Sequence, residues 1–153
     1  MKYIIGVGNY SMFDDSIGIR IIEYIVEKKL ENNFTAVDLS GNALNLLSYL
    51  NEETERIVII DTVKMDIGPG EFKFFKPESV VTEKQLAGFS THEGDLIKVI
   101  ELGMRTGHSI PEIHIMGIEP DEIKSEFGLS DILQSRIDFY SEKAMEKINE
   151  QKN

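Results

Sequence analysis

The hydrophobic and polar positions change period along the chain, and the order of these periods predicts strands alternating with helices. Residues 2–7 and 56–61 are short apolar runs, which are typical of buried strands. Within 15–30, apolar residues recur every three or four positions opposite charged ones, so we expect an amphipathic helix. A second strand is predicted at 34–38, and a second helix at 43–50 follows a Ser-Gly-Asn turn. This alternation favours a parallel sheet with helices on both faces.

The second half of the chain departs from this alternation. Only residues 62–70 separate the third strand from a predicted strand at 71–75. A parallel crossover needs about a dozen residues or more, so we expect this fourth strand to be antiparallel. Residues 76–92 are polar without a firm period, and we expect them to form a mobile rim of the site. The remaining predicted elements are a helix at 93–104, a core strand at 112–117 and a C-terminal helix at 130–149 that Ser130 caps.

These elements predict an α/β fold, a three-layer sandwich of a mostly parallel five-stranded sheet with one antiparallel strand and helices on both faces. Residues 1–153 are expected to form a single domain, because this length with 41% hydrophobic residues is enough for one core. The net charge of −11 repels phosphate backbones and anionic lipid, so neither nucleic acid nor a membrane is an expected partner.

Cysteine is absent, which excludes disulfides, thiolate nucleophiles and cysteine zinc sites. The apolar run at the N-terminus is too short for a signal peptide, and no stretch approaches the length of a membrane span. We therefore expect a cytoplasmic protein. We also expect a monomer.

Polar residues gather where the predicted strands end. The first strand runs into a Gly6-Val7-Gly8-Asn9 turn, which the acidic pair Asp14-Asp15 follows. Asp61 ends the third strand, and His92 lies in a loop ahead of a helix. Strands one and three are normally neighbours in such a sheet, and ligands bind outside their carboxyl ends. Two carboxylates and an imidazole from three loops make a plausible oxygen and nitrogen metal site.

Two other functions share parts of this pattern. Gly6-Val7-Gly8 with Asp38 as a ribose acceptor suggests dinucleotide binding, but Ser11 stands where the third glycine is needed and the helix starts too late. Phosphorylated receiver domains also combine an acidic pair with an aspartate such as Asp61. Their acidic pair follows the strand directly, however, and a lysine follows their last core strand; neither feature is present here.

Each candidate also has a simpler structural explanation when it is taken alone. Asp14 or Asp15 alone suits a helix N-cap or first turn, Asp61 a turn, and a loop histidine is commonly just exposed. Their coincidence at one end of the sheet favours a site. His114 lies inside the predicted last strand and is expected to be structural, while His108 is expected to face solvent at the opposite end of the sheet.

Taken in order, these motifs resemble those of the hydrogenase maturation endopeptidases over nearly the whole chain. The family's acidic motif matches Asp14-Asp15-Ser16-Ile17-Gly18-Ile19-Arg20, with Asp15 where glutamate is frequent. Its later turns match Gly117-Ile118-Glu119-Pro120-Asp121 and Gly128-Leu129-Ser130. Its Asp-Gly-Gly-Thr turn is represented by Asp38-Leu39-Ser40-Gly41, in which the glycine is shifted.

The resemblance implies a metal-dependent endopeptidase that removes the C-terminal extension of a nickel–iron hydrogenase large-subunit precursor after nickel insertion. Asp15, Asp61 and His92 would be both the catalytic and the metal-binding residues. Nickel would arrive within the substrate as the recognition element, although other divalent metals suit the same ligands. The metal would polarise the scissile carbonyl and activate a water molecule, or Asp15 or Asp61 would be the general base; the sequence leaves these alternatives open.

Overall fold

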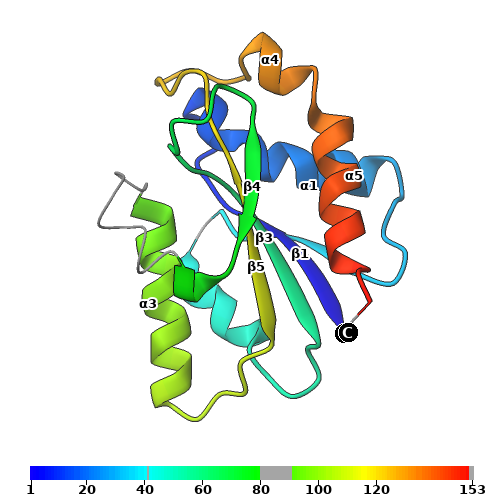
Figure 1. Cartoon of the computed structure of the whole chain (residues 1–153), viewed down its shortest axis with the longest axis vertical. Coiled ribbons are helices and arrows are strands. Elements are labelled where there is room, and N and C mark those ends of the chain that lie inside the picture. Colours follow the sequence, from blue (N-terminus) through cyan, green and yellow to red (C-terminus); the bar gives the residue numbers. More distant parts are fainter. Residues whose placement is uncertain (41, 80–90, 152–153) are drawn as a thin grey trace.

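Figure 1 shows the computed structural model of the chain, which describes residues 1–40, 42–79 and 91–151, without the side chains of 91–94. The described strands form one five-stranded sheet with the order β2-β1-β3-β5-β4. They are β1 (Lys2–Gly6), β2 (Thr35–Asp38), β3 (Arg56–Thr62), β4 (Phe72–Phe75) and β5 (Glu112–Ile118). Only the β4–β5 pairing is antiparallel, with Phe72 opposite Ile118. The prediction of a mostly parallel sheet with one antiparallel strand is confirmed.

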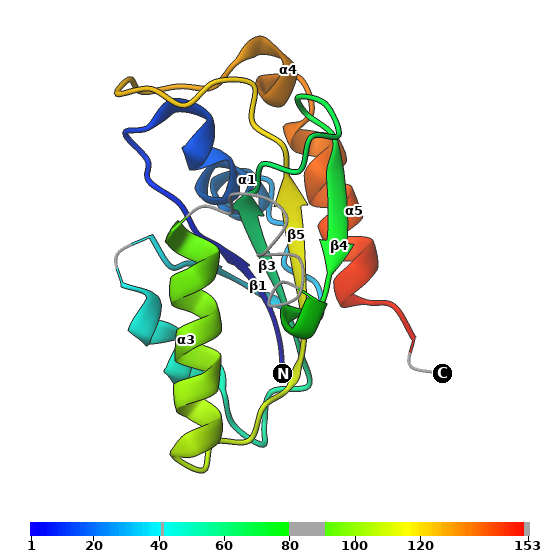
Figure 2. The same ribbon diagram turned by 60° about the vertical axis from the view of Figure 1, so that its left-hand side comes forward.

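Helices cover both faces of this sheet, which confirms the predicted three layers. The described helical elements are η1 (Phe13–Ser16), α1 (Ile17–Glu27), η2 (Ala43–Tyr49), α3 (Thr91–Arg105), α4 (Asp131–Gln134) and α5 (Ile137–Ile148). In Figure 2, α3 lies on one side of the sheet, and α1 and α5 lie on the other. Helix α3 also contacts η2, and α1 contacts α5.

Strand β3 lies at the centre of the sheet and separates two hydrophobic clusters. All seven of its residues are buried, as expected for a parallel strand with helices on both faces. Val58 and Ile60 pack with the cluster under α1 and α5, which includes Tyr140. Ile57 and Ile59 pack with the opposite cluster under α3 and η2. Adjacent residues of the strand thus serve opposite cores, because successive side chains point to opposite faces.

Several predicted helices differ in the structure. Residues 43–49 form a 3-10 helix rather than an α-helix, with the side chain of Asn42 accepting a hydrogen bond from Leu44 N. The first α-helix begins at Ile17 instead of 15, because a 3-10 turn precedes it. The C-terminal helix is broken into α4 and α5, since Arg136 leaves the helical conformation with φ −113°. Its guanidinium instead donates to Gly70 O at 2.9 Å, a contact with the turn before β4.

The capping role predicted for Ser130 is wrong in one respect. Ser130 occupies the N-cap position of α4, but its side chain makes no capping hydrogen bond. The expected mobile rim falls mostly on residues 80–90, which lie outside the described residues. Helix α3 begins at Thr91, so His92 belongs to its first turn rather than to a preceding loop. Among the described helices, none is both long and apolar enough to cross a membrane.

Candidate active site

The turn after β1 and the end of β3 meet at the carboxyl edge of the sheet. Gly6 pairs with Ile60, and Val7 N donates to Ile60 O at 3.0 Å, so the two chain segments continue side by side beyond the sheet. Gly8 has φ +138°, and a β-carbon there would lie 2.1 Å from Asp15 O. Only glycine permits this approach. The glycine turn therefore lets η1 fold back against β1, and this fold brings Asp15 to the end of β3.

Thr62 connects the two carboxylates predicted for the site. Its hydroxyl donates to Asp15 Oδ1 at 2.7 Å, and its backbone N–H donates to Asp61 Oδ1 at 2.8 Å. The second oxygen of Asp15 accepts from Asn9 N at 3.0 Å. Asp15 is 6% exposed and Asp61 is fully buried. The structure thus places these two carboxylates at the edge where β1 and β3 end, in orientations fixed by hydrogen bonds.

The third predicted residue, His92, is placed only by its backbone in the first turn of α3, because its side chain lies outside the described residues. Among the side chains that the structure describes, no group of three or more histidines and acidic residues could hold a metal ion. Asp15 and Asp61 supply carboxylate oxygens, which suit divalent cations. Their chemistry fits part of a metal site, and the complete trio stays a prediction.

Asp14, the first member of the acidic pair, has a structural role. It is fully buried. Its Oδ2 accepts from Asp121 N and Glu122 N at 2.9 Å each, and its Oδ1 accepts from Ser130 N at 2.7 Å. These bonds attach η1 to the segment between β5 and α4. Adjacent aspartates therefore face different surroundings, and Asp14 fixes the shape of the edge on which Asp15 lies.

Sequence reasoning missed Thr62 and Glu119 as residues of this edge. Glu119 is 8% exposed, and its Oε1 accepts from Met65 N at 2.8 Å and Ile67 N at 3.1 Å. It therefore holds the loop that follows Asp61 and Thr62. A polar residue at the end of a buried strand, as Thr62 is, or directly after one, as Glu119 is, was the available signal, since buried polar groups need partners.

A cleft of about 180 Å³ opens beside the glycine turn. It lies between Gly8, the loop after β2 and the start of α3, and its lining includes Ser40, Asn42 and Asp95. The cleft is smaller than the roughly 300–1,000 Å³ of pockets that enclose drug-sized ligands. The described cleft is therefore too small to enclose a dinucleotide.

The other two histidines lie away from this edge, as expected. His108 is exposed beyond the C-terminal end of α3, where Thr106 Oγ1 lies 2.9 Å from its Nδ1. His114 belongs to β5, with Nε2 3.6 Å from Glu112 Oε2. Burial lowers the pKa of His114 and thereby favours the neutral ring, against the opposing effect of Glu112. Neither residue is near Asp15 or Asp61.

The family model described as hydrogenase maturation protease matches residues 19–148. The chain belongs to the hydrogenase maturation protease family. The matched part includes Asp61 and His92, whereas the glycine turn and Asp15 precede it.

Solved structures of related proteins have the same fold as this family member over most of its length. The NiFe hydrogenase maturation protease HybD from Thermococcus kodakarensis is 27% identical with a TM-score of 0.79, and the alignment covers 97% of this chain and 100% of that one. The hydrogenase maturating endopeptidase HybD from E. coli has a TM-score of 0.80 at 21% identity, covering 97% and 92%. This similarity in fold matches the predicted architecture.

Two of the related proteins are longer than this chain. The hydrogenase expression/formation protein HupD from Bradyrhizobium diazoefficiens is 24% identical over 126 residues, which are 82% of this chain and 65% of that protein. HupD from Rhizobium leguminosarum is 23% identical, and the chain covers 62% of it. The chain thus spans a little under two thirds of these two relatives. Membership of the maturation protease family argues against both the receiver and the dinucleotide-binding assignments.

Proposed function

We propose that the chain is a metal-dependent endopeptidase that removes the C-terminal extension of a nickel–iron hydrogenase large-subunit precursor once nickel has been inserted. The observation that carries the proposal is the pair of carboxylates, Asp15 and Asp61, which Thr62 connects at the carboxyl edge of the sheet. The chain belongs to the hydrogenase maturation protease family, and carboxylate oxygens suit divalent cations, so this pair is suited to contact a metal-bearing substrate.

Nickel belongs to the substrate in this proposal, and Asp15, Asp61 and His92 are the enzyme groups that contact it. Three protein ligands leave coordination positions for the precursor's own groups. A precursor without nickel would lack the element that positions its scissile bond at these residues. The metal thereby makes cleavage conditional on completed nickel insertion.

Hydrolysis adds water across the scissile peptide bond. Water oxygen bonds to the carbonyl carbon, the carbon–nitrogen bond breaks, and a proton passes to the leaving amine. A carboxylate of the pair would accept the water's proton and return it to the amine, as general acid–base catalysis requires. Nickel in the substrate would polarise the carbonyl and make bound water more acidic. Asp15 and Asp61 are both candidates for the proton acceptor.

The burial of the pair imposes a condition on binding. Asp61 has no exposed surface and Asp15 has very little. Direct contact with nickel therefore requires the surrounding segments to move when the precursor binds. The proposed enzyme acts as a cytoplasmic monomer, with the precursor rather than nucleic acid or a membrane as its partner.

The test is to incubate the purified protein with a nickel-loaded precursor and with the same precursor lacking nickel. Mass spectrometry of the released tail should show cleavage of the loaded form alone. Asp61→Asn and His92→Ala should abolish cleavage, whereas His108→Ala, which removes an exposed histidine at the far end of α3, should retain it. Failure to cleave the loaded precursor would refute the peptidase assignment. Efficient cleavage of the nickel-free form would refute the metal requirement alone.

A further inference from the structure

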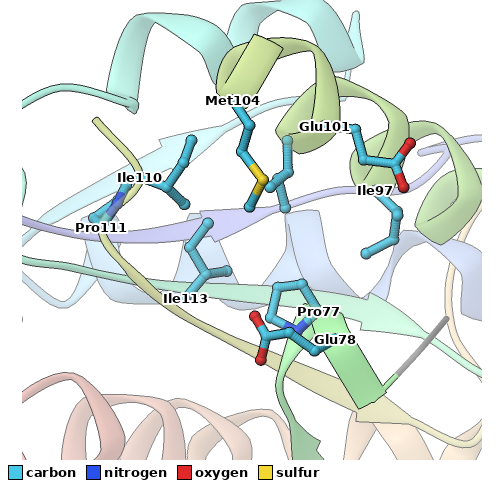
Figure 3. A pocket seen from close by; sticks show the side chains of 9 residues that line it. Pro77, Glu78, Ile97, Glu101, Met104, Ile110, Pro111 and Ile113 are labelled. Carbon is cyan, nitrogen blue, oxygen red and sulfur yellow. The ribbon is translucent and has the colours of Figure 1, made fainter. Parts of the chain in front are cut away.

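An apolar groove separate from the carboxylate pair lies along α3. Its volume is about 200 Å³. As Figure 3 shows, Ile97 and Met104 from α3 face Ile110, Pro111 and Ile113, which lead into and form the start of β5. The two sides of the groove thus come from different elements, and apolar side chains converge between them.

Part of the apolar lining of this groove is exposed to solvent. Met104 is 57% exposed although it lies beside the buried residues Ile100 and Ile113. Strand β4 pairs with β5 only from Ile115 to Ile118, so it does not extend along the part of β5 that lines the groove. Methionine is a flexible side chain suited to adaptable binding surfaces.

Acidic side chains flank this apolar floor. Glu78 follows Pro77 on one side of the groove, and Glu101 stands on α3 across from it (Figure 3). Both are exposed, and neither has a described salt bridge. In a chain with a net charge of −11, such a rim attracts a basic rather than an acidic partner. The expected occupant therefore combines an apolar side chain with neighbouring lysine or arginine residues.

Helix α3 links this groove to the proposed active site. His92 lies in the first turn of α3, and Ile97 and Met104 follow five and twelve residues later. At about 1.5 Å per residue, the groove extends from roughly 8 to 18 Å along the helix from His92. About six extended residues span the longer distance. One polypeptide can therefore occupy the groove while another part of it reaches the first turn of α3, where His92 lies.

We propose that this groove is a docking site for the hydrogenase large-subunit precursor. It takes an apolar side chain of the precursor between α3 and β5, and Glu78 and Glu101 pair with basic residues beside that side chain. This inference rests on the proposed function, whose substrate it locates on a second surface. Docking raises the affinity for the folded precursor without contributing to bond cleavage.

The test measures processing of the nickel-loaded precursor by wild type, Met104→Asp and Glu101→Lys. Both positions are exposed, so the variants should fold, and unfolding curves check this. Each should raise KM about five- to tenfold and leave kcat nearly unchanged, because the loss of an anchoring contact weakens binding. Leu102→Asp on another face of α3 and Glu142→Lys on α5 are matched controls. We expect each to keep KM within about twofold.

A photo-crosslinking amino acid at position 104 identifies the occupant. It should capture a precursor peptide with an apolar residue beside lysine or arginine, whereas the same group at position 102 should not. An unchanged KM in both groove variants, while wild type processes normally, would overturn the docking site and leave the peptidase assignment standing. Crosslinking to a second copy of the enzyme would assign the groove to self-association instead, if sedimentation also shows a wild-type dimer that the Met104→Asp substitution converts to a monomer. If wild type fails to process the loaded precursor, the proposed function itself fails.

Discussion

Replacing Asp14 by asparagine tests whether the first carboxylate of the acidic pair is structural. The change keeps the shape of the side chain but leaves one oxygen and one NH2 group where three backbone N–H groups now donate to two oxygens. If the oxygen stays on Asp121 N and Glu122 N, the NH2 group faces Ser130 N–H across a 2.7 Å contact. The opposite orientation breaks two hydrogen bonds instead of one, because Oδ2 accepts from both Asp121 N and Glu122 N.

The first orientation sets the minimum loss. A hydrogen bond to a charged group contributes about 1.5–3 kcal/mol, and the two retained bonds each weaken by about 0.5–1 kcal/mol when the acceptor becomes neutral. We therefore expect Asp14→Asn to lower the free energy of unfolding by about 2.5–5 kcal/mol, a large part of a typical 5–15 kcal/mol total. The loss is large because Asp14 has no exposed surface through which water could replace these bonds.

Urea unfolding followed by circular dichroism measures this loss, with the slope of the transition checked for constancy. Asp131→Asn is the control, because Asp131 is an exposed residue in the first turn of α4. Removing its charge should change the free energy of unfolding by about 0.3–1 kcal/mol. Processing activity per folded molecule should fall less in Asp14→Asn than in Asp15→Asn. An unfolding free energy within about 1 kcal/mol of wild type would refute the structural role.

Three further predictions follow from buried polar groups. Burial raises the pKa of Tyr140 to about 12, and its hydroxyl donates to Gly70 O. Because the folded state keeps this proton to higher pH than the unfolded state does, the contribution of Tyr140 to the free energy of unfolding is complete below pH 10 and declines towards pH 12. Unfolding titrations should show this loss, at most about 2–3 kcal/mol, in wild type and not in Tyr140→Phe. Ser130→Ala should keep or raise the free energy of unfolding, since the buried hydroxyl has no hydrogen-bond partner among the described residues; a loss of about 1 kcal/mol would restore the capping role. Thr62→Val should lower kcat and destabilise by about 1–2 kcal/mol through its lost bond to Asp15, whereas Thr62→Ser should retain activity.

Local sequence pattern was enough to predict most of the sheet. The continuous apolar run of β3 indicated a strand buried on both faces, because a parallel sheet between helices leaves neither face to water. The short connection before β4 predicted its direction, since too few residues remain for a crossover. These predictions depend on the spacing of residues close in the chain, and the core of each face follows from the same alternation.

Helix boundaries were predicted less well, because distant contacts decide them. The helical period continues from α4 into α5, yet the helix is interrupted at Arg136, whose guanidinium donates a hydrogen bond to Gly70 O. Nothing in residues 130–149 alone indicates that contact. The 3-10 turn before α1 likewise depends on Asp14 meeting the segment after β5. Helical propensity is weak enough for such tertiary bonds to override it.

By itself the sequence determined the order of elements, the two faces of the sheet and the edge at which Asp15 and Asp61 lie. Only the tertiary structure decided what each carboxylate does there. Asp14 binds backbone groups more than 100 residues away, while its neighbour Asp15 accepts from Thr62, 47 residues away. Sequence neighbours within a tight turn point in different directions, and their partners exist only after the chain has closed these long loops. The hydrophobic period of a sequence predicts which face of a helix or strand is buried, whereas the packing of the folded chain sets hydrogen-bond partners across such distances.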